Sequence, residues 1–402
     1  MLLGISNEPR PYHWGSRTAI ADLLGREPSA EPEAELWLGA HPGSPSRILE
    51  PSAARGAADL AEFTAPDGLP FLLKILAAEQ PLSLQVHPNP EHARDGYEAE
   101  NTAGIALADP RRNYKDPLHK PELIIALSDE FRALVGFRAI EDTRALLIAL
   151  LSLGAGLPDA PEPAVLAPLV ARVTGPDPLA TTVRWLLAAG EDVAALVPAV
   201  VALAALSAED APHAAQFRLV GELAELYPDD PGIVISLLLN HVVLHAGEAL
   251  YLAAGNIHSY LSGVGVELMA SSDNVLRGGL TSKHVDVPEL MSVLDATPSA
   301  VPMLPAVELD PGVSVFRPPL PDFQLYRIDL DPDSSPEASV PLTGPAIAIV
   351  TTGVIDVLGN DLPMLLRRGQ ALFATGDEPS LSFRGEGTLF LATVGVAGSA
   401  TS

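Results

Sequence analysis

Short apolar segments separated by clusters of Pro, Gly and Asn dominate the first third of the chain. Apolar runs of roughly four to eight residues between such turn residues are typical of β-strands, because helices need longer runs. The pattern therefore predicts an all-β region from residue 1 to about residue 137. Its expected strands are residues 35–38, 70–76, 82–87 and 122–127.

Apolar residues take helical spacing between about residues 139 and 239, where Ala, Leu, Glu and Asp dominate. Residues 140–151 and 217–227 show this spacing most clearly. The most apolar stretch, 193–207, contains a proline and is shorter than the roughly 20 residues that a bilayer-spanning helix needs. The pattern predicts a helical insertion with buried faces and no membrane partner.

Strand-like sequence resumes at residues 241–252 and, after a proline-rich linker at about 298–321, continues in alternating runs. The clearest of these runs are 346–357 and 385–394. Alternation of this kind predicts a second β barrel or sandwich near the C-terminus. We expect three domains, namely a discontinuous β domain (1–138 and 240–320), a helical insertion (139–239) and a C-terminal β domain (321–402).

Four side chains of metal-ligand type occupy these strands: Gln85, His87, Glu122 and His258. Ser83, Gln85 and His87 alternate with apolar residues, so one strand face should carry all three. Glu122 shares a face with Lys120, and His258 follows a Gly-Asn turn. An amide, a carboxylate and two imidazoles suit Zn²⁺ that keeps a position open for water or substrate. Because His258 has to reach Gln85, the strands on both sides of the insertion should form one barrel.

Charge and composition narrow the possible partners. A net charge of −27 repels phosphate backbones and anionic lipid, so nucleic acid is excluded as a partner. The absence of cysteine excludes disulfides and thiolate chemistry, and the first residues lack the basic start of a signal peptide, which predicts a cytoplasmic protein. The four lysines lie near the ligand segments, although a biased composition could also leave so few by chance: Lys74, Lys115, Lys120 and Lys283.

Several motifs together resemble the type I mannose-6-phosphate isomerases, also called phosphomannose isomerases. The motifs lie at residues 12–15, 35–42, 85–89, 119–122, 255–263 and 272–283. The resemblance covers the β segments in order to about residue 290, while the helical middle and the C-terminal third match only in position and character. His13, Leu36 and Leu38 depart from residues common in the family and affect the expected shape of the substrate pocket.

The resemblance implies a cupin-type double-stranded β-helix (jelly roll) as the catalytic barrel, with a second, cupin-like C-terminal β domain. It implies a zinc-dependent enzyme that interconverts mannose 6-phosphate and fructose 6-phosphate. We expect one Zn²⁺ per chain and a monomeric protein. By the same resemblance Arg277 is the residue assigned to catalysis. The implied zinc ligands are Gln85, His87, Glu122 and His258.

Aldose–ketose isomerisation moves a proton between neighbouring carbons through an enediol, so it needs a base, an electrophile and a phosphate anchor. Glu267 can be the base, and Lys120 can stabilise the developing oxyanion. Arg277 and Lys283 can bind the phosphate or support proton transfer. The remaining expected substrate contacts are Trp14, Ser83 and Lys74.

Each assignment has a structural alternative. Glu267 could instead orient Lys120 or a ligand imidazole, Arg277 could pair with an acidic neighbour, and Trp14 could be a core aromatic. Two other functions also remain open at this point. One is a metal cupin of another activity, such as an iron oxygenase, which metal analysis would separate. The other is a non-catalytic sugar-binding or regulatory metal cupin, which would bind ligand without turnover.

Overall fold

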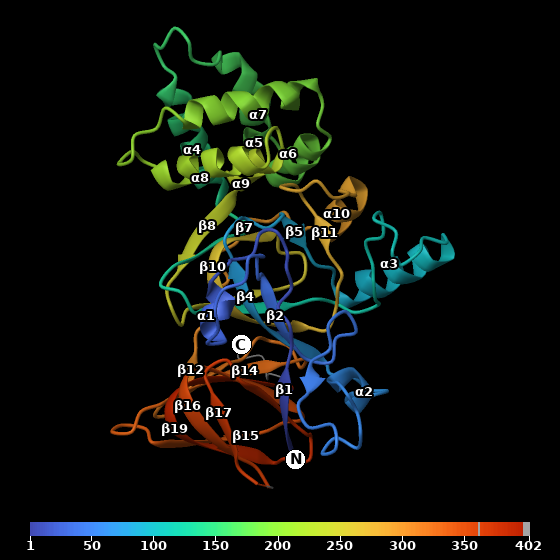
Figure 1. Ribbon diagram of the computed structural model, residues 1–402. Helices are drawn as coiled ribbons and strands as arrows, with labels where there is room; N and C mark the ends of the chain where they lie inside the picture. Colours follow the sequence, from blue (N-terminus) through green and yellow to red (C-terminus); the bar gives the residue numbers. More distant parts are fainter. Residues whose placement is uncertain (361, 397–402) are drawn as a thin grey trace.

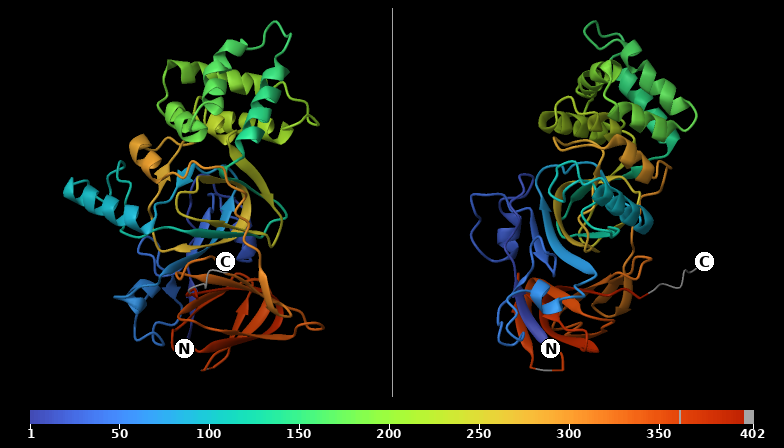
Figure 2. Two further views of the ribbon diagram at one scale, coloured as in Figure 1. Left: turned by 180° about the vertical axis from the view of Figure 1, so that it is seen from behind. Right: turned by 90° about the vertical axis from the view of Figure 1, so that its right-hand side faces the viewer.

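The computed structural model describes residues 1–360 and 362–396, and it is built mainly of two antiparallel sheets. A helical layer, a first β barrel and a C-terminal β barrel are stacked in that order along the molecule (Figure 1). The views from behind and from the side show the same three layers (Figure 2). The predicted fold class, mostly β with a helical insertion, is confirmed.

The first barrel is a nine-stranded sheet formed by segments on both sides of the helical layer. Its long strand β10 pairs with β4 and β6 along its second half, and with β5 and β7 near its start. The predicted joining of the two β segments into one barrel is therefore confirmed. The strands are β2 (Glu35–Leu38), β4 (Phe71–Ala78), β5 (Gln85–Val86), β6 (Glu122–Ala126), β7 (Phe131–Phe137), β8 (Leu239–Leu244), β9 (Ala249–Leu252), β10 (His258–Ala270) and β11 (Leu276–Arg277).

The predicted strand 82–87 is shorter than its alternating pattern indicates. Only Gln85–Val86 is a regular strand, because the residues before it bond to different neighbours. The amide of Leu82 donates to the carbonyl of Tyr260 at 2.9 Å, whereas that of Leu84 donates to the carbonyl of Gly279 at 3.0 Å. The segment is held across the end of the barrel without one continuous partner strand.

The segment with helical spacing folds into helices that pack on one apolar core. The helices are α4 (Ile140–Leu153), η1 (Pro163–Leu166), α5 (Ala167–Thr174), α6 (Pro178–Leu187), α7 (Glu191–Ala204), α8 (Ala214–Leu226) and α9 (Gly232–Ser236). No single helix of the described residues is long and apolar enough to cross a membrane, and one bent pair, α6 and α7, meets the criteria of length and composition only when combined. Outside this layer, the described residues form four more helices: α1 (Ala19–Leu23), α2 (Leu60–Thr64), α3 (Pro90–Thr102) and α10 (Val287–Val293).

The C-terminal barrel is a ten-stranded sheet that also contains the first strand of the chain. β1 pairs with β18 and β3, so hydrogen bonds join the N-terminus to the last strands, a pairing that a division at residue 321 did not predict. The linker predicted at 298–321 was wrong in part, because β12 and β13 form a hairpin that pairs with β14. The strands are β1 (Leu2–Ser6), β3 (Arg47–Ile48), β12 (Val307–Asp310), β13 (Val313–Phe316), β14 (Gln324–Leu330), β15 (Glu337–Pro341), β16 (Ala346–Leu358), β17 (Met364–Arg367), β18 (Ala371–Ala374) and β19 (Ser380–Thr393).

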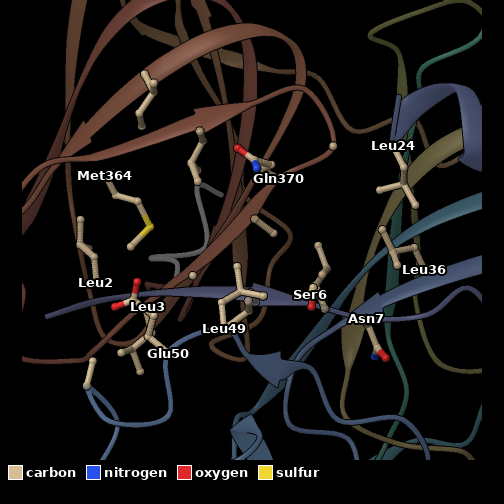
Figure 3. Close-up of a pocket in the computed structure, with 18 residues that line it drawn as sticks. Leu2, Leu3, Ser6, Asn7, Leu24, Leu36, Leu49, Glu50, Met364 and Gln370 are labelled. Atoms are coloured by element: carbon tan, nitrogen blue, oxygen red, sulfur yellow. The ribbon is translucent and has the colours of Figure 1, made fainter. Parts of the chain in front are cut away.

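A cavity of about 490 Å³ lies where β1, β2 and β17 meet (Figure 3). Leucines dominate its lining, and Leu36 and Leu38 of β2 contribute to it. Glu50 is the one ionisable residue among the lining residues. The cavity therefore offers neither a metal-ligand set nor a phosphate-binding cation, and the predicted chemistry lies elsewhere.

Candidate metal centre

Two histidines and a glutamate from three segments meet inside the first barrel. Nε2 of His87 lies 3.2 Å from Oε1 of Glu122, and Nε2 of His258 lies 3.2 Å from Oε2 of the same carboxylate. Their candidate ligand atoms all lie within 4.8 Å of one another, and all three residues are buried. His87 follows β5, Glu122 begins β6 and His258 begins β10. Pairing of these strand ends in one barrel brings together residues that are far apart in sequence.

Backbone carbonyls fix the orientation of both imidazoles. Nδ1 of His87 lies 2.8 Å from the carbonyl oxygen of Asn274, and Nδ1 of His258 lies 3.0 Å from that of Asn256. Because a carbonyl can only accept, each Nδ1 carries the proton and each Nε2 keeps its lone pair. Both lone pairs face the carboxylate of Glu122. Metal-binding histidines are typically oriented in this way, by a hydrogen bond from the ring nitrogen that does not bind the metal.

The unpaired atoms of this cluster fit a divalent metal ion. Neither Nε2 atom has a hydrogen-bond partner within the described part of the chain, and the same is true of Oε2 of Glu122. A buried polar atom without a partner costs about 1–3 kcal/mol, which a bound cation would offset. Burial, together with the charge of Lys120, lowers the pKa of His87 to about 4. The imidazole is therefore neutral at pH 7, as a metal ligand must be.

Gln85, the predicted fourth ligand, lies next to this cluster in the sheet. Its backbone is opposite His258 on one side and opposite Arg277 on the other. Gln85 also lines a cavity of about 190 Å³. The pairing of Gln85 with both strands thus places the cavity beside the metal cluster. The role of the Gln85 side-chain amide as a ligand stays a prediction.

Two buried lysines pair with the carboxylates inside the barrel. Nζ of Lys120 lies 2.8 Å from Oε1 of Glu122. Nζ of Lys74 lies 3.0 Å from Oε2 of Glu267 and 3.8 Å from Oε1 of Glu35. The three carboxylates and two ammonium groups together carry one net negative charge. A divalent cation bound among them would make the net charge of this group positive. That sign attracts a phosphorylated substrate.

The ion pair between Lys74 and Glu267 has perturbed pKa values on both sides. Burial alone would lower the pKa of Lys74, but the carboxylates of Glu267 and Glu35 hold it above its usual value. Burial is the largest cause that raises the pKa of Glu267 above that of an ordinary glutamate. A carboxyl group with a raised pKa is suited to exchange a proton near neutral pH.

Two cations without acidic partners line the small cavity. Neither Arg277 nor Lys283 forms an ion pair with a carboxylate in residues 1–360 and 362–396, so an acidic neighbour does not account for Arg277. Burial lowers the pKa of Arg277, and burial together with Arg277 lowers the pKa of Lys283. Trp14 and Ser83 line the same cavity. Unpaired cations in a chain of net charge −27 mark a site for an anionic ligand.

The structure separates the predicted site residues into two groups. Lys74 and Glu267 lie in the barrel interior and do not line the cavity that contains Arg277. Lys74, predicted to bind substrate, instead contacts carboxylates and Trp37; its Nζ lies 5.0 Å from the centroid of the Trp37 ring. Trp14 has both expected characters, since it packs on an apolar cluster of the barrel and lines the cavity. Tyr227 from the helical layer also lines the cavity. No sequence signal marked it, because only the packing of α8 against the barrel brings it there.

Antiparallel barrel strands around a buried pair of histidines and a carboxylate define a metal-dependent protein of the cupin type. The comparisons specify the family. A family model described as the catalytic domain of type I phosphomannose isomerase matches residues 2–140. The mannose-6-phosphate isomerase of Escherichia coli K12 is 36% identical over 405 residues, with 95% of this chain and 97% of the relative covered. The human mannose-6-phosphate isomerase is 30% identical over 426 residues, with 91% and 92% covered.

Solved structures agree with the sequence relatives. A crystal structure of mannose 6-phosphate isomerase bound with zinc and yttrium matches with a TM-score of 0.83 at 34% identity, covering 98% of this chain and 100% of that one. A variant of phosphomannose isomerase from Salmonella typhimurium matches with a TM-score of 0.84 at 34% identity over the same shares. The chain belongs to the type I phosphomannose isomerases, the mannose-6-phosphate isomerases, and is a zinc-dependent isomerase. The predicted family, activity class and cofactor are confirmed, in place of an oxygenase or a non-catalytic cupin.

Proposed function

We propose that the protein interconverts mannose 6-phosphate and fructose 6-phosphate at one zinc ion held by Gln85, His87, Glu122 and His258. The observation that carries this proposal is the pair of buried Nε2 atoms without partners, both directed at Glu122. Zinc supplies a Lewis acid that orients and polarises the sugar oxygens when bound. The two imidazoles are held for this task by the carbonyls behind them.

The phosphate of the substrate binds Arg277 and Lys283 in the cavity. Arg277 offers two parallel hydrogen bonds through its guanidinium, and Lys283 adds a point charge. The backbone of Gln85 lies between those of Arg277 and His258, so the phosphate would bind next to the strand ends that carry the metal ligands. Trp14 and Ser83 line the same cavity and are proposed to contact the sugar.

Proton transfer is assigned to Glu267, with Lys120 as the stabiliser of negative oxygen. The raised pKa of Glu267 supports the first assignment. Lys74, 3.0 Å from this carboxylate, fixes its position and balances its charge when the proton leaves. Lys120 is held by Glu122 at 2.8 Å, which keeps its ammonium group beside the ligand cluster. An oxyanion that develops on the sugar therefore meets a preorganised cation.

The test is a coupled assay of mannose 6-phosphate conversion on protein before and after chelation. We expect chelation to abolish turnover and added zinc to restore it. Unphosphorylated mannose is the matched control substrate, since it lacks only the group that Arg277 and Lys283 bind. Equal efficiency on the two sugars would refute the phosphate site, and full activity of the metal-free protein would refute the zinc site.

We also propose that the protein acts as a monomer in the cytoplasm, with no nucleic acid or membrane as partner. The net charge of −27 supports the absence of these anionic partners. Light scattering at assay concentration tests the oligomeric state, and a mass near 42.1 kDa is expected for the monomer.

A further inference from the structure

We propose that Asp116 is a positioning residue for the zinc site, because its carboxylate holds the loop whose carbonyl orients His87. Asp116 is not in the metal cluster, and it lies in the connection that leads into β6. The inference rests on the proposed zinc site and adds a residue that controls how tightly this site binds metal.

The carboxylate of Asp116 binds two elements of the loop at residues 272–274. Its Oδ1 accepts a hydrogen bond from the hydroxyl of Ser272 at 2.8 Å, and its Oδ2 accepts one from the amide of Asp273 at 2.9 Å. Oδ1 also accepts from the amide of Leu118 at 3.0 Å. Both carboxylate oxygens are therefore used by donors in fixed directions, which sets the position of the loop relative to the connection.

The side chain of Asn274 fastens the same two segments from the other side. Its Oδ1 accepts from the amide of Lys115 at 2.7 Å. Its Nδ2 donates to the carbonyls of Asp116 and Leu118, both at 2.8 Å. Asn274 and Ser272 are 1% and 0% exposed, so water does not compete for these bonds. We call Asp116, Ser272 and Asn274 the clamp.

The clamp connects two of the candidate zinc ligands. The carbonyl of Asn274 accepts from Nδ1 of His87 at 2.8 Å, which directs the other ring nitrogen at Glu122. The connection that carries Asp116 continues directly to Glu122 at the start of β6. Displacement of the clamp would therefore alter the orientation of His87 relative to Glu122. Mutation of a residue that hydrogen-bonds to a metal ligand typically weakens metal affinity 10- to 100-fold.

The clamp also explains a sequence motif that had no chemical role. Residues 272–283 resemble the family, but only Arg277 and Lys283 received a function from their chemistry. Ser272 and Asn274 now have one, since their side chains are consumed by the clamp. The role of Asp116 needed the structure, because its partners in the loop, Ser272 and Asp273, lie more than 150 positions away in the chain.

The experiment compares the zinc affinity of Asp116→Asn with that of the unchanged protein, by competition with a chelator of known affinity. The asparagine keeps the size of the side chain, but one of its two terminal atoms becomes an NH2 group that cannot accept, so either the amide of Asp273 or the donors at Oδ1, Ser272 and Leu118, lose their acceptor. We expect the zinc dissociation constant to rise at least about tenfold, with kcat largely recovered at saturating zinc. Asp109→Asn is the matched control, because Asp109 lies half-buried in the same connection and, among the described residues, its carboxylate accepts hydrogen bonds from Arg111 alone.

The outcomes separate this inference from the proposed function. If the unchanged protein bound no zinc, the proposed function would fail. If it bound zinc and Asp116→Asn bound it as tightly as Asp109→Asn does, only the positioning role would be refuted. Ser272→Ala removes the hydrogen bonds of the Ser272 hydroxyl to Asp116 and Asn274, and it serves if Asp116→Asn does not fold. It should also weaken zinc binding relative to the control, and unchanged affinity would refute the role in the same way.

Discussion

Replacement of Arg277 by lysine is the perturbation that examines the phosphate site most sharply. The substitution keeps one positive charge in the cavity but removes the planar fork that holds an oxyanion with two hydrogen bonds. Arg277 is half-buried and has no acidic partner within the described residues, so its guanidinium is available to a ligand. The fold should tolerate the change, because no ion pair is broken.

The expected loss follows from the number of donors. Removal of one preorganised donor costs roughly 2–4 kcal/mol of transition-state stabilisation, which corresponds to a decrease of about 30- to 900-fold in kcat/KM. Lys283 lines the same cavity and retains part of the attraction for phosphate. The loss should therefore fall within this range without abolishing activity.

The assay is kcat/KM for mannose 6-phosphate, with zinc content determined on the same sample. Arg111→Lys is the control, since Arg111 is exposed and pairs with Asp109 at 2.8 Å away from the cavity. Near-normal turnover of Arg277→Lys would show that the residue is structural. Loss of zinc from this variant would instead show that Arg277 supports the metal ligands, and would refute the separation of the two sites.

Three further predictions concern the barrel and its junction with the helices. His87→Ala and His258→Ala should each lose zinc and activity together, as measured by elemental analysis beside the coupled assay; retention of metal would contradict their role as ligands. Lys74→Met should lower the free energy of unfolding in urea by about 3–5 kcal/mol, because it leaves the buried Glu267 without its cation, and a loss below about 1 kcal/mol would contradict this. Burial and the neighbouring Arg132 lower the pKa of His241 to about 4. As the pH falls, the unfolded state therefore takes up a proton before the folded state does, and the free energy of unfolding should fall by up to about 2 kcal/mol between pH 7 and pH 5. His241→Gln should flatten this pH dependence in denaturant titrations, and an unchanged pH dependence would contradict the prediction.

Much of the fold could be predicted because apolar periodicity reports local structure directly. The helical spacing of residues 140–151 and the alternation of 346–357 correspond to α4 and β16. The strand at 82–87 was overestimated, since a period of two shows which side is buried but not whether a partner strand runs alongside. The hairpin of β12 and β13 was missed because all four residues of β12 are exposed, so no buried apolar face marks this strand.

The side chains of the candidate site could be predicted from the sequence, but the backbone groups that orient them could not. His87, Glu122 and His258 meet as expected from their residue types. The carbonyls of Asn256 and Asn274 that orient the two imidazoles have no sequence signal, because every residue carries a carbonyl. Which of them faces a histidine depends on loop positions that only tertiary packing determines.

The most direct test of the metal site is the amount of zinc per chain, measured by elemental analysis on freshly purified protein beside Glu122→Ala. Glu122 joins the two histidines in the cluster, so its removal takes away the shared carboxylate. The structure predicts one zinc per chain in the unchanged protein and almost none in the variant. A fully active protein that contains no zinc, or a variant that retains it in full, would contradict the assignment.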